Sequence, residues 1–438
     1  MKILMLADFY YSGEGGLQTH VQSLVKALSS RGHDVFVCTI GQKDIPREKN
    51  FALYALWGIF QRIPLLFRNK DMRYAPPIRD WLIARRLAEL IRILDPDVIH
   101  VHGWLLYSVI SLAERFQIPL VATLHDYGFI CPRRGSVMYC SNPLTFSCIL
   151  CGREVFGILK SLFVFFALKV NKPNLRKVDR YIAISPYQMD VFRRSLGFDE
   201  DKVVLIPNGI DLSRFYPGVS ESFVPIECAA LMKGHHERRV VHVGRMSVEK
   251  MDAPLAILEA ARTIVSKFPD TVIWIVGSGE YYHRLSSLGT KVNEDLKKDV
   301  VVFTGPVAVA CMPAVLDRAT VIIGVGRVAY EAMACGKAVI VAGSARGPLG
   351  GNYGGVVSPS NVADLEVHNF SGRNARNVTN GQRIADDCIR LLGDDEYRLK
   401  IGGFGRSYIE TEHSLEAVAA RVEDLYLDLL AKKGRTAK

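Results

Sequence analysis

Short apolar runs alternate with amphipathic segments along the first half of the chain. Six of these runs have the length and composition of buried strands: KILMLADF, DVFVCTI, DVIHVH, PLVATLHD, RYIAIS and KVVLIPNGI. Between them, apolar residues recur at helical spacing over residues 16–30, 77–94, 104–116 and 186–196. Continuous apolar strands separated by helices indicate a parallel sheet that is covered on both faces.

A second series of the same kind begins at Arg238, with the apolar runs RRVVHVG, TVIWIVGSG, VVVFTGPV, TVIIGVG and KAVIVAG. The pattern therefore predicts an α/β protein with two doubly wound Rossmann-like domains. The Pro, Asn-Gly and Ser content of the intervening segment is typical of turns and a linker, which places the domains at 1–212 and 213–414. Helical periodicity continues beyond them, and we expect residues 415–438 to return to the first domain.

Ligands of open parallel sheets bind beyond the carboxyl ends of the strands, and two such domains facing each other predict a binding cleft. Gly15 and Gly16 follow the first strand and open a helix, whose free N–H groups suit phosphate. The dinucleotide fingerprint of three spaced glycines is absent there, which disfavours a nicotinamide enzyme. His125 and Asp126 follow a later strand, where a histidine serves either in chemistry or as a hydrogen-bonded structural residue.

The second series places two cations directly after its first strand. Arg245 leaves the strand end and Lys250 follows close to the next helix. A planar guanidinium and an ammonium that converge on one strand end predict a clamp for a diphosphate, with surface charges as the alternative. A later apolar run stops at Gly324 and Gly326, and the helix after it carries the acid Glu331. An anion site at that helix N-terminus and an ordinary strand–helix turn both fit this segment alone.

The composition is that of a globular protein, with 438 residues, 49% of them hydrophobic and 23% charged. The net charge of +10 suits anionic ligands such as nucleotides, diphosphates, nucleic acids or acidic lipids. Nucleic-acid binding is disfavoured, because the cations are spread along the chain and no aromatic–basic motif is present.

Two apolar stretches with basic edges lie at residues 51–70 and 155–177. Each suits either a segment that lies in a membrane surface or a buried core helix. The first residues predict a strand rather than a secretory signal, and no apolar run reaches the roughly 18 residues of a spanning helix. We therefore expect a cytoplasmic protein, with a candidate peripheral contact at the inner face of the membrane.

Nine cysteines are present, and they fall into two groups. Scattered apolar or helical contexts predict small core residues of a reducing compartment for five of them, namely Cys38, Cys228, Cys311, Cys335 and Cys388. The other four are clustered, namely Cys131, Cys140, Cys148 and Cys151. This cluster predicts a structural zinc site or an iron–sulfur cluster, with disulfides or unlinked thiols as alternatives.

The ordered motifs of the whole chain resemble a known family. GGLQTHVQSLVKALSSRGHDVFV, PDVIHVH, TLHD, IPNGIDLSRFYP, VGRMSVEK, IVGSGE and EAMACGKAVIVAG occur in this order. Their order and spacing are similar to those of the retaining glycosyltransferases of the GT-B fold, family four. The resemblance implies transfer of a sugar from a nucleotide diphosphate sugar to an acceptor hydroxyl, without a catalytic metal. It also implies a role in cell-surface polysaccharide or glycolipid synthesis, on a glycan or lipid-linked acceptor.

The resemblance also assigns roles to individual residues. It implies that Arg245 and Lys250 hold the donor diphosphate, that Gly16 lets the leaving diphosphate lie against the backbone, and that His125 lies near the transferred sugar. For the nucleotide, it implies phosphate contacts from the loop residues Gly326, Arg327 and Val328, ribose binding by Glu331, and base contacts at Gly305 and Val307.

One position departs from the family pattern. Many members have an acid eight positions before the one matched by Glu331, and it contacts the donor sugar; this chain has Ile323 there. Diphosphate binding is unaffected, whereas recognition of the sugar must differ. Two alternatives keep the same scaffold: a sugar-nucleotide epimerase, and a non-catalytic partner subunit that the missing acid favours.

Overall fold

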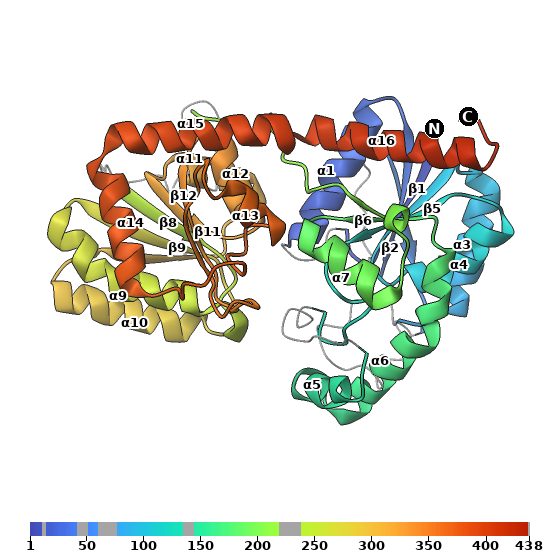
Figure 1. Ribbon diagram of the computed structural model, residues 1–438, viewed down its shortest axis with the longest axis horizontal. Helices are drawn as coiled ribbons and strands as arrows, with labels where there is room; N and C mark the ends of the chain where they lie inside the picture. The colour runs from blue at the N-terminus through green and yellow to red at the C-terminus, as the bar shows by residue number, and fades with distance from the viewer. Residues whose placement is uncertain (11–14, 42–50, 60–76, 135–143, 219–237, 437–438) are drawn as a thin grey trace. The chain divides into compact units, whose positions relative to one another are not determined.

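Two parallel sheets organise the chain, one in each of two units (Figure 1). The computed structural model describes residues 1–10, 15–41, 51–59, 77–134, 144–218 and 238–436. The first unit comprises Met1–Gly209 together with Leu415–Lys438, and the second comprises Ile210–Ser414. This is the GT-B architecture of two doubly wound domains that the alternation of strands and helices predicts.

Within the described ranges, the sheet of the first unit has seven parallel strands in the order β3-β2-β1-β4-β5-β6-β7. The strands are β1 (Lys2–Ala7), β2 (Asp34–Ile40), β3 (Ala52–Leu56), β4 (Val98–His102), β5 (Leu120–Leu124), β6 (Arg180–Ala183) and β7 (Val203–Leu205). The main helices are α1 (Gly16–Ser30), α3 (Trp81–Leu94), α4 (Leu106–Arg115), α5 (Ser147–Phe156), α6 (Ile158–Asn171), α7 (Pro186–Leu196) and α16 (Leu415–Lys432). The strand order reverses between β1 and β4, so the switch point where such sheets bind ligands lies between these two strands.

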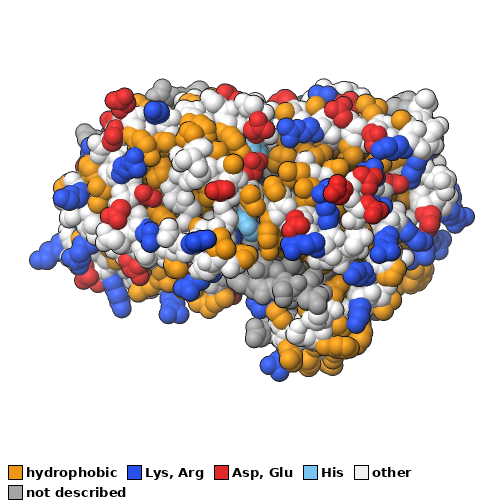
Figure 2. Space-filling view, viewed as in Figure 1, with side chains coloured by type: hydrophobic (Ala, Val, Ile, Leu, Met, Phe, Trp, Pro, Cys, Tyr) orange, Lys and Arg blue, Asp and Glu red, His pale blue; other side chains and the backbone are white. Residues whose placement is uncertain are grey.

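The helices α5 and α6 form a hairpin with an apolar outer face. Gly152 lets the two helices approach closely, because a Cβ atom there would collide with the Ser161 hydroxyl. Figure 2 shows apolar side chains gathered at the lower end of the view, where Figure 1 draws this hairpin. We call its exposed large residues the hairpin surface: Phe146, Leu150, Ile158, Leu159, Phe166 and Val170. No helix within the described part of the chain combines the length and apolar character needed to cross a bilayer.

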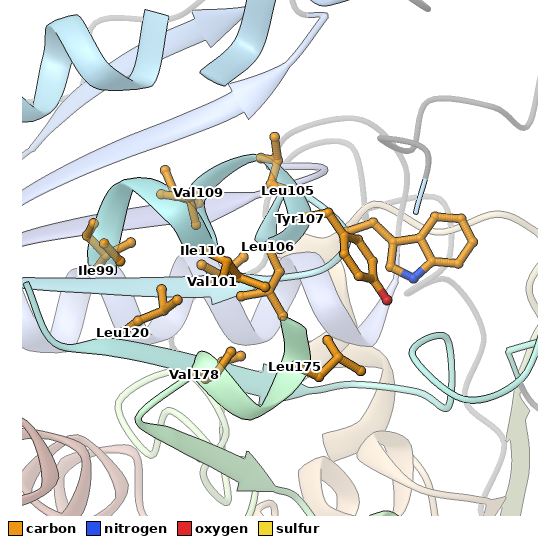
Figure 3. Close-up of a cluster of buried hydrophobic side chains, with 14 of the residues drawn as sticks. Ile99, Val101, Leu105, Leu106, Tyr107, Val109, Ile110, Leu120, Leu175 and Val178 are labelled. Atoms are coloured by element: carbon orange, nitrogen blue, oxygen red, sulfur yellow. The ribbon is translucent and has the colours of Figure 1, made fainter. Parts of the chain in front are cut away.

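The alternating side chains of the first sheet build two separate cores. Leu4 and Leu6 of β1 face α3 and α4, whereas Ile3 and Met5 face α1 and α16. Figure 3 shows part of the first core, in which Val101 of β4 packs against Leu106 and Ile110 at α4. Burial on both faces explains why these strands have continuous apolar runs rather than alternating ones.

The second unit repeats this design with six strands among the described residues, in the order β10-β9-β8-β11-β12-β13. The strands are β8 (Arg238–Val243), β9 (Thr271–Val276), β10 (Val301–Gly305), β11 (Val321–Gly324), β12 (Ala338–Ala342) and β13 (Tyr353–Val356). The helices are α9 (Asp252–Lys267), α10 (Tyr282–Leu296), α11 (Met312–Asp317), α12 (Arg327–Ala334), α13 (Val362–Val367), α14 (Gly381–Gly393) and α15 (Asp395–Glu412). The switch point lies between β8 and β11, and only β13 among the described strands is antiparallel to its neighbour.

Two segments differ from the sequence-based expectation. Residues 52–56, the start of the first apolar stretch, form the edge strand β3 rather than a helix, while residues 60–70 lie outside the described part. The glycine-rich segment 350–377, whose composition predicts a loop, instead contains the strand β13 and the helix α13. Gly354 is needed within β13, because a Cβ atom there would lie 2.5 Å from the Leu365 side chain. Gly354 therefore allows close packing within a strand and does not indicate a loop.

The last helix completes the core of the first unit. Figure 1 shows α16 above α1 in the view, and the two helices pack against each other. Val418, Val422 and Tyr426 of α16 are buried in the core that also holds Ile3 and Met5. Its Tyr426 hydroxyl lies 2.6 Å from Nδ1 of His100, on the central strand β4. Residues more than 300 positions apart therefore share one polar contact inside a single core.

Candidate functional site

The switch point of the second unit brings together two segments that the sequence analysis singled out. β8 and β11 are parallel neighbours in the register Val241↔Ile322 and His242↔Ile323. Their carboxyl ends therefore leave the sheet at the same edge. Arg245 follows β8, and Gly326 follows β11 as the residue before α12. The positive end of the α12 dipole and Arg245 therefore lie at the same edge of the sheet.

Three cations gather beside the end of β8. Lys250 lies in the short 3-10 helix η5 (Val248–Lys250), and its pKa is lowered below the usual lysine value. The main cause of the lowered pKa is that surrounding protein atoms displace water from the ammonium group, although the residue as a whole is exposed. The next causes are the positive charges of Arg245 and Arg373. The charge of Glu249 opposes the shift, and the remaining repulsion between the cations makes this edge suited to binding an anion.

Arg373 was not identified from the sequence. It lies in the segment SGRNARN, at the end of the glycine-rich stretch that the pattern predicts as a loop. The structure ties this segment to the start of α12, because the Gly326 N–H donates a hydrogen bond of 3.0 Å to the Phe370 carbonyl. The two basic residues of SGRNARN were a usable signal, but the sequence alone gave no reason to place them beside Lys250.

Glu331 is buried on α12 and paired with Arg327 one turn earlier. The Arg327 Nε donates a hydrogen bond of 2.7 Å to Oε1 of Glu331. Burial raises the pKa of the Glu331 carboxyl, while the charge of Arg327, its hydrogen bond and the charge of Arg214 oppose the rise. Nη1 of Arg327 is buried and has no hydrogen-bond partner among the described residues. The pair can therefore offer an acceptor oxygen to hydroxyl groups and a donor to an anion.

Ile323 occupies the position of the missing acid and is fully buried in β11. Its carbonyl accepts a hydrogen bond of 3.0 Å from Nδ1 of His242, on the neighbouring strand. The side chain packs in the core with Val240 and Ile273. This apolar side chain cannot hydrogen-bond a sugar hydroxyl, so other groups must recognise the sugar.

His242 also makes the second unit sensitive to acid. Burial lowers its pKa from 6.5 to about 4; the hydrogen bond to Ile323 opposes this shift and the charge of Lys250 adds to it. The folded state therefore binds the proton less readily than the unfolded chain. We expect the free energy of unfolding to fall by about 1.4 kcal/mol per pH unit between about pH 6.5 and 4 on account of this residue.

Chemical denaturation of the His242→Gln variant over this pH range tests that expectation. The variant should show a weaker pH dependence than the original chain, whereas the exposed His283 provides a control through His283→Gln. Equal slopes in the original and the His242→Gln protein would contradict the assignment.

Two glycines hold the segment that carries Arg245. Gly277 and Gly279 have φ angles of +132° and +154°, and Cβ atoms there would collide with the carbonyl oxygens of Gly244 and Met246. The two segments are joined by hydrogen bonds from the Gly244 N–H to Val276 (3.0 Å) and from the Met246 N–H to Ser278 (2.9 Å). The turn after β9 therefore packs closely against the turn after β8 and holds it in place.

The residues predicted to meet the base lie two strands away from β8. Gly305 ends β10 with a φ of +73°, and its carbonyl accepts a hydrogen bond of 2.9 Å from the Gly277 N–H. Val307 is buried in the core beside α11. Both belong to the same carboxyl edge of the sheet as Arg245, and base contacts at this edge stay a prediction.

In the first unit, Asp8 marks the switch point. Its carboxylate accepts hydrogen bonds of 2.9 Å from the N–H groups of Trp104 and Leu105. Burial raises the pKa of Asp8 to about 6, against the opposing effect of these two bonds. Gly103 is required here, because a Cβ atom at this residue would lie 2.6 Å from the carboxylate.

His125 and Gly16 lie near this edge on separate elements. His125 follows β5 and lines a small hollow together with Leu17, Gly103, Trp104, Thr123, Asp126, Phe129 and Arg134. Burial lowers the pKa of His125 well below its usual value, so its ring is neutral at pH 7. A Cβ atom on Gly16 would meet no described atom within 4 Å. The described residues thus give no reason for glycine at that position, which fits the approach of a ligand.

The cysteines form no metal centre in the described part of the chain. Cys140 lies outside it, and Cys131, Cys148 and Cys151 do not form a group with metal-binding spacing. A structural zinc or iron–sulfur site therefore gains no support. Cys38, Cys335 and Cys388 are buried free thiols, as expected for core residues. Cys311 differs from that expectation, because it is disulfide-bonded; Cys228 lies outside the described residues.

The only described residues with metal-binding spacing are the histidines His20, His102 and His125. The sequence analysis named His125 alone. The repeat of histidine at alternate positions in DVIHVH, at the end of a predicted strand, was the available signal for His102. Nothing in the sequence brought the helical residue His20 to the same place.

Comparison with known families and proteins covers most of the chain. Residues 14–214 match the family described as Glycosyltransferase Family 4, and residues 237–367 match the family described as Glycosyl transferases group 1. The phosphatidyl-myo-inositol mannosyltransferase of Mycobacterium tuberculosis is 24% identical over 441 residues, which cover 97% of this chain and 96% of that protein.

A second relative matches a smaller part. The GDP-mannose-dependent monoacylated alpha-(1-6)-phosphatidylinositol monomannoside mannosyltransferase of Corynebacterium glutamicum is 25% identical over 268 residues, which cover 58% of this chain. The match spans 65% of that protein, slightly less than two thirds of its length. Among solved structures, the sucrose-phosphate synthase of Thermosynechococcus elongatus superposes with a TM-score of 0.65 at 21% identity, over 98% of this chain and 99% of that one.

Proposed function

The chain belongs to glycosyltransferase family 4, and from this membership we propose that it moves a sugar from a nucleotide diphosphate sugar to the hydroxyl of a lipid-linked acceptor, with retention of the anomeric configuration. One observation carries the proposal. Arg245, Lys250 and Arg373 gather at the switch point of the second unit, where the N-terminus of α12 also lies. Three cations that meet at the carboxyl edge of a parallel sheet suit a diphosphate.

The proposed catalysis is electrostatic. When the bond between the sugar and the diphosphate breaks, negative charge grows on the leaving phosphate oxygens. Lys250 and Arg245 are preorganised by the turns around them, so they stabilise this charge without having to reorganise. The proton of the acceptor hydroxyl then passes to the departing phosphate, and no protein nucleophile is required. The family needs no cofactor for this reaction, and the proposal invokes none.

The second unit is also proposed to select the nucleotide. Glu331 would accept hydrogen bonds from the ribose hydroxyls through the carboxylate that Arg327 holds in place. Arg327 and Val328 would present backbone N–H groups at the start of α12, where the first N–H groups of a helix have no partner within it. The Gly326 N–H is already engaged by the Phe370 carbonyl, so Gly326 would contribute through the shape of the turn. Nη1 of Arg327 is a further donor for a phosphate oxygen.

The first unit is proposed to contribute Gly16 and His125. Gly16 begins α1, and its open surroundings would let a phosphate lie against the backbone. His125 is neutral and lines the hollow at the carboxyl edge of the sheet, so its ring could hydrogen-bond a sugar hydroxyl without placing a second charge beside the diphosphate.

A lipid-linked acceptor is supported by the names of both relatives, which act on phosphatidylinositol derivatives. The hairpin surface gives independent support within this chain. Leu159, Phe166 and Val170 follow one stripe of α6, and Leu159 is 81% exposed. From residue 157 to residue 178 the sequence has five basic and no acidic residues. An apolar stripe with basic flanks suits the surface of an acidic membrane.

Vesicle binding tests this surface. We expect the Leu159→Glu variant to bind acidic phospholipid vesicles at least about tenfold more weakly in a sedimentation assay, because it places a charge in the apolar face that would enter the membrane. Leu399 on α15 is 69% exposed and carries the matched control Leu399→Glu. Equal losses in both variants, or no loss in either, would count against the hairpin surface as the membrane contact.

The function itself is tested with a panel of nucleotide sugars. The full chain is incubated with each donor, with and without vesicles that contain a phosphatidylinositol acceptor, and release of the nucleoside diphosphate is measured. Acceptor-dependent release and a glycolipid product are expected. Conversion of the donor sugar without an acceptor would instead identify an epimerase. Binding of the nucleotide without turnover would identify a non-catalytic partner subunit, the alternative that Ile323 favours.

A further inference from the structure

Three histidines from different elements converge at the switch point of the first unit. His20 lies on α1, His102 ends β4 and His125 directly follows β5. One ligand atom from each lies within 4.8 Å of the other two. We propose that this histidine triad binds a first-row transition-metal ion of borderline softness, such as Zn²⁺ or Co²⁺, as a regulatory rather than a catalytic ligand.

The donor set determines which metals fit. Three imidazoles form the usual partial shell of a zinc ion that keeps one further position for water or substrate. Imidazole nitrogen favours zinc, cobalt, nickel and copper over magnesium and calcium, which prefer oxygen. Burial lowers the pKa of both His102 and His125, and neighbouring histidines lower it further. Their rings are therefore neutral at pH 7, the state in which they bind metals.

The contacts of His102 orient its ring for this role. Its Nε2 lies 2.9 Å from Sδ of Met5, and its Nδ1 lies 2.8 Å from Nε2 of His125. Sulfur can only accept a hydrogen bond, so the proton of a neutral His102 belongs on Nε2 and the lone pair of Nδ1 faces His125. A metal ion would replace the hydrogen bond between the two rings. Met5 would then act as an outer partner that keeps the ring in place.

Neighbouring groups neither complete the triad nor oppose it strongly. The ring of His100 lies 4.3 Å from that of His102, but both its nitrogens are engaged, by Tyr426 and Thr123. Arg134 is the nearby cation, and its charge is balanced by Asp126 at 2.9 Å. Asp8 is the other acid near this pair. Of the three histidines, His125 also lines the hollow at the carboxyl edge of the sheet.

Occupation of the triad has a consequence for transfer. The proposed function assigns His125 to the transferred sugar, so a metal ion on its Nε2 should interfere with sugar binding and inhibit the reaction. This consequence rests on the proposed function, whereas metal binding itself does not. The two are therefore measured separately.

Cobalt titration of the chelator-treated full chain tests the site directly. We expect one equivalent of Co²⁺ to give the visible absorption of a four-coordinate ion, and stoichiometric Zn²⁺ to remove it. Magnesium in large excess should leave the spectrum unchanged. Failure to obtain the band, or a band that saturates only with many equivalents, would overturn the proposal.

Two ligand variants and one control complete the test. The variants His102→Gln and His20→Gln should each weaken Co²⁺ binding by at least about 100-fold, while His283→Gln, which alters an exposed histidine, should bind like the original chain. His102 is more deeply built into the sheet, so His20→Gln decides the matter if His102→Gln does not fold. Unchanged affinity in His20→Gln would refute the triad. Intact metal binding without transfer on any donor would count against the proposed function alone.

Discussion

Replacement of Lys250 by alanine is expected to lower kcat for sugar transfer by about 100-fold or more. The ammonium lies beside Arg245 and Arg373, and the charges of these two residues add to the burial that lowers its pKa, against the opposing charge of Glu249, so the three cations repel one another. A diphosphate relieves this repulsion most when its charge is highest, which is in the transition state. The loss should therefore appear mainly in kcat rather than in KM.

Steady-state kinetics with the active donor from the nucleotide-sugar panel measure this effect. Lys291 is exposed on α10, and Lys291→Ala removes the same charge from the same unit without touching the proposed site. Lys250→Arg should recover part of the rate, because it restores the charge at a different geometry. If Lys250→Ala and Lys291→Ala turned over the donor equally fast, the diphosphate clamp would have to be abandoned.

Substitution of Gly277 by alanine is expected to destabilise the second unit by about 3 kcal/mol or more. The φ of +132° is unfavourable for any residue with a side chain, and the added Cβ atom meets the backbone carbonyl of Gly244 rather than a flexible side chain. The turn after β8 must move to make room. The same change should therefore displace Arg245 and weaken nucleotide binding.

Thermal unfolding of the transition that belongs to the second unit provides the measurement, with a fall of roughly 6–12 °C expected for a unit of this size. Gly403 is the matched control, because it is an exposed residue of α15 and a Cβ atom there meets nothing within 4 Å. Gly403→Ala should raise stability by about 0.5–1 kcal/mol, since alanine favours a helix more than glycine does. Equal unfolding temperatures for Gly277→Ala and Gly403→Ala would show that the contact between the two turns contributes less to stability than its geometry indicates.

The helices and strands that depend only on the local pattern of apolar residues could be predicted from the sequence. The strands carry continuous apolar runs because both faces of each sheet are buried, and the helix at residues 186–196 was predicted with the bounds that the structure has for α7. The series of motifs also indicated the family, because glycines and charges follow particular strands. Arg245 and Gly326 were placed correctly relative to the strands for this reason.

The remaining features depend on contacts between distant segments. Arg373 reaches Lys250 only because the Phe370 carbonyl docks on the start of α12, and no local pattern encodes that contact. The glycines around Tyr353 are typical of loops, whereas the structure uses them for close packing in β13. His20 was missed because helical periodicity shows which face is buried but does not show which strand end the face meets.

The contribution of α16 to the first unit affects how the protein is made. The ribosome releases residues 415–432 only after the whole second unit has been synthesised, yet Val418, Val422 and Tyr426 fill the core beside β1. During translation the first unit must therefore wait with one apolar face uncovered, while the second can already fold. A chaperone that shields apolar surface is most needed in that interval, and any truncation before Leu415 would make the exposure permanent.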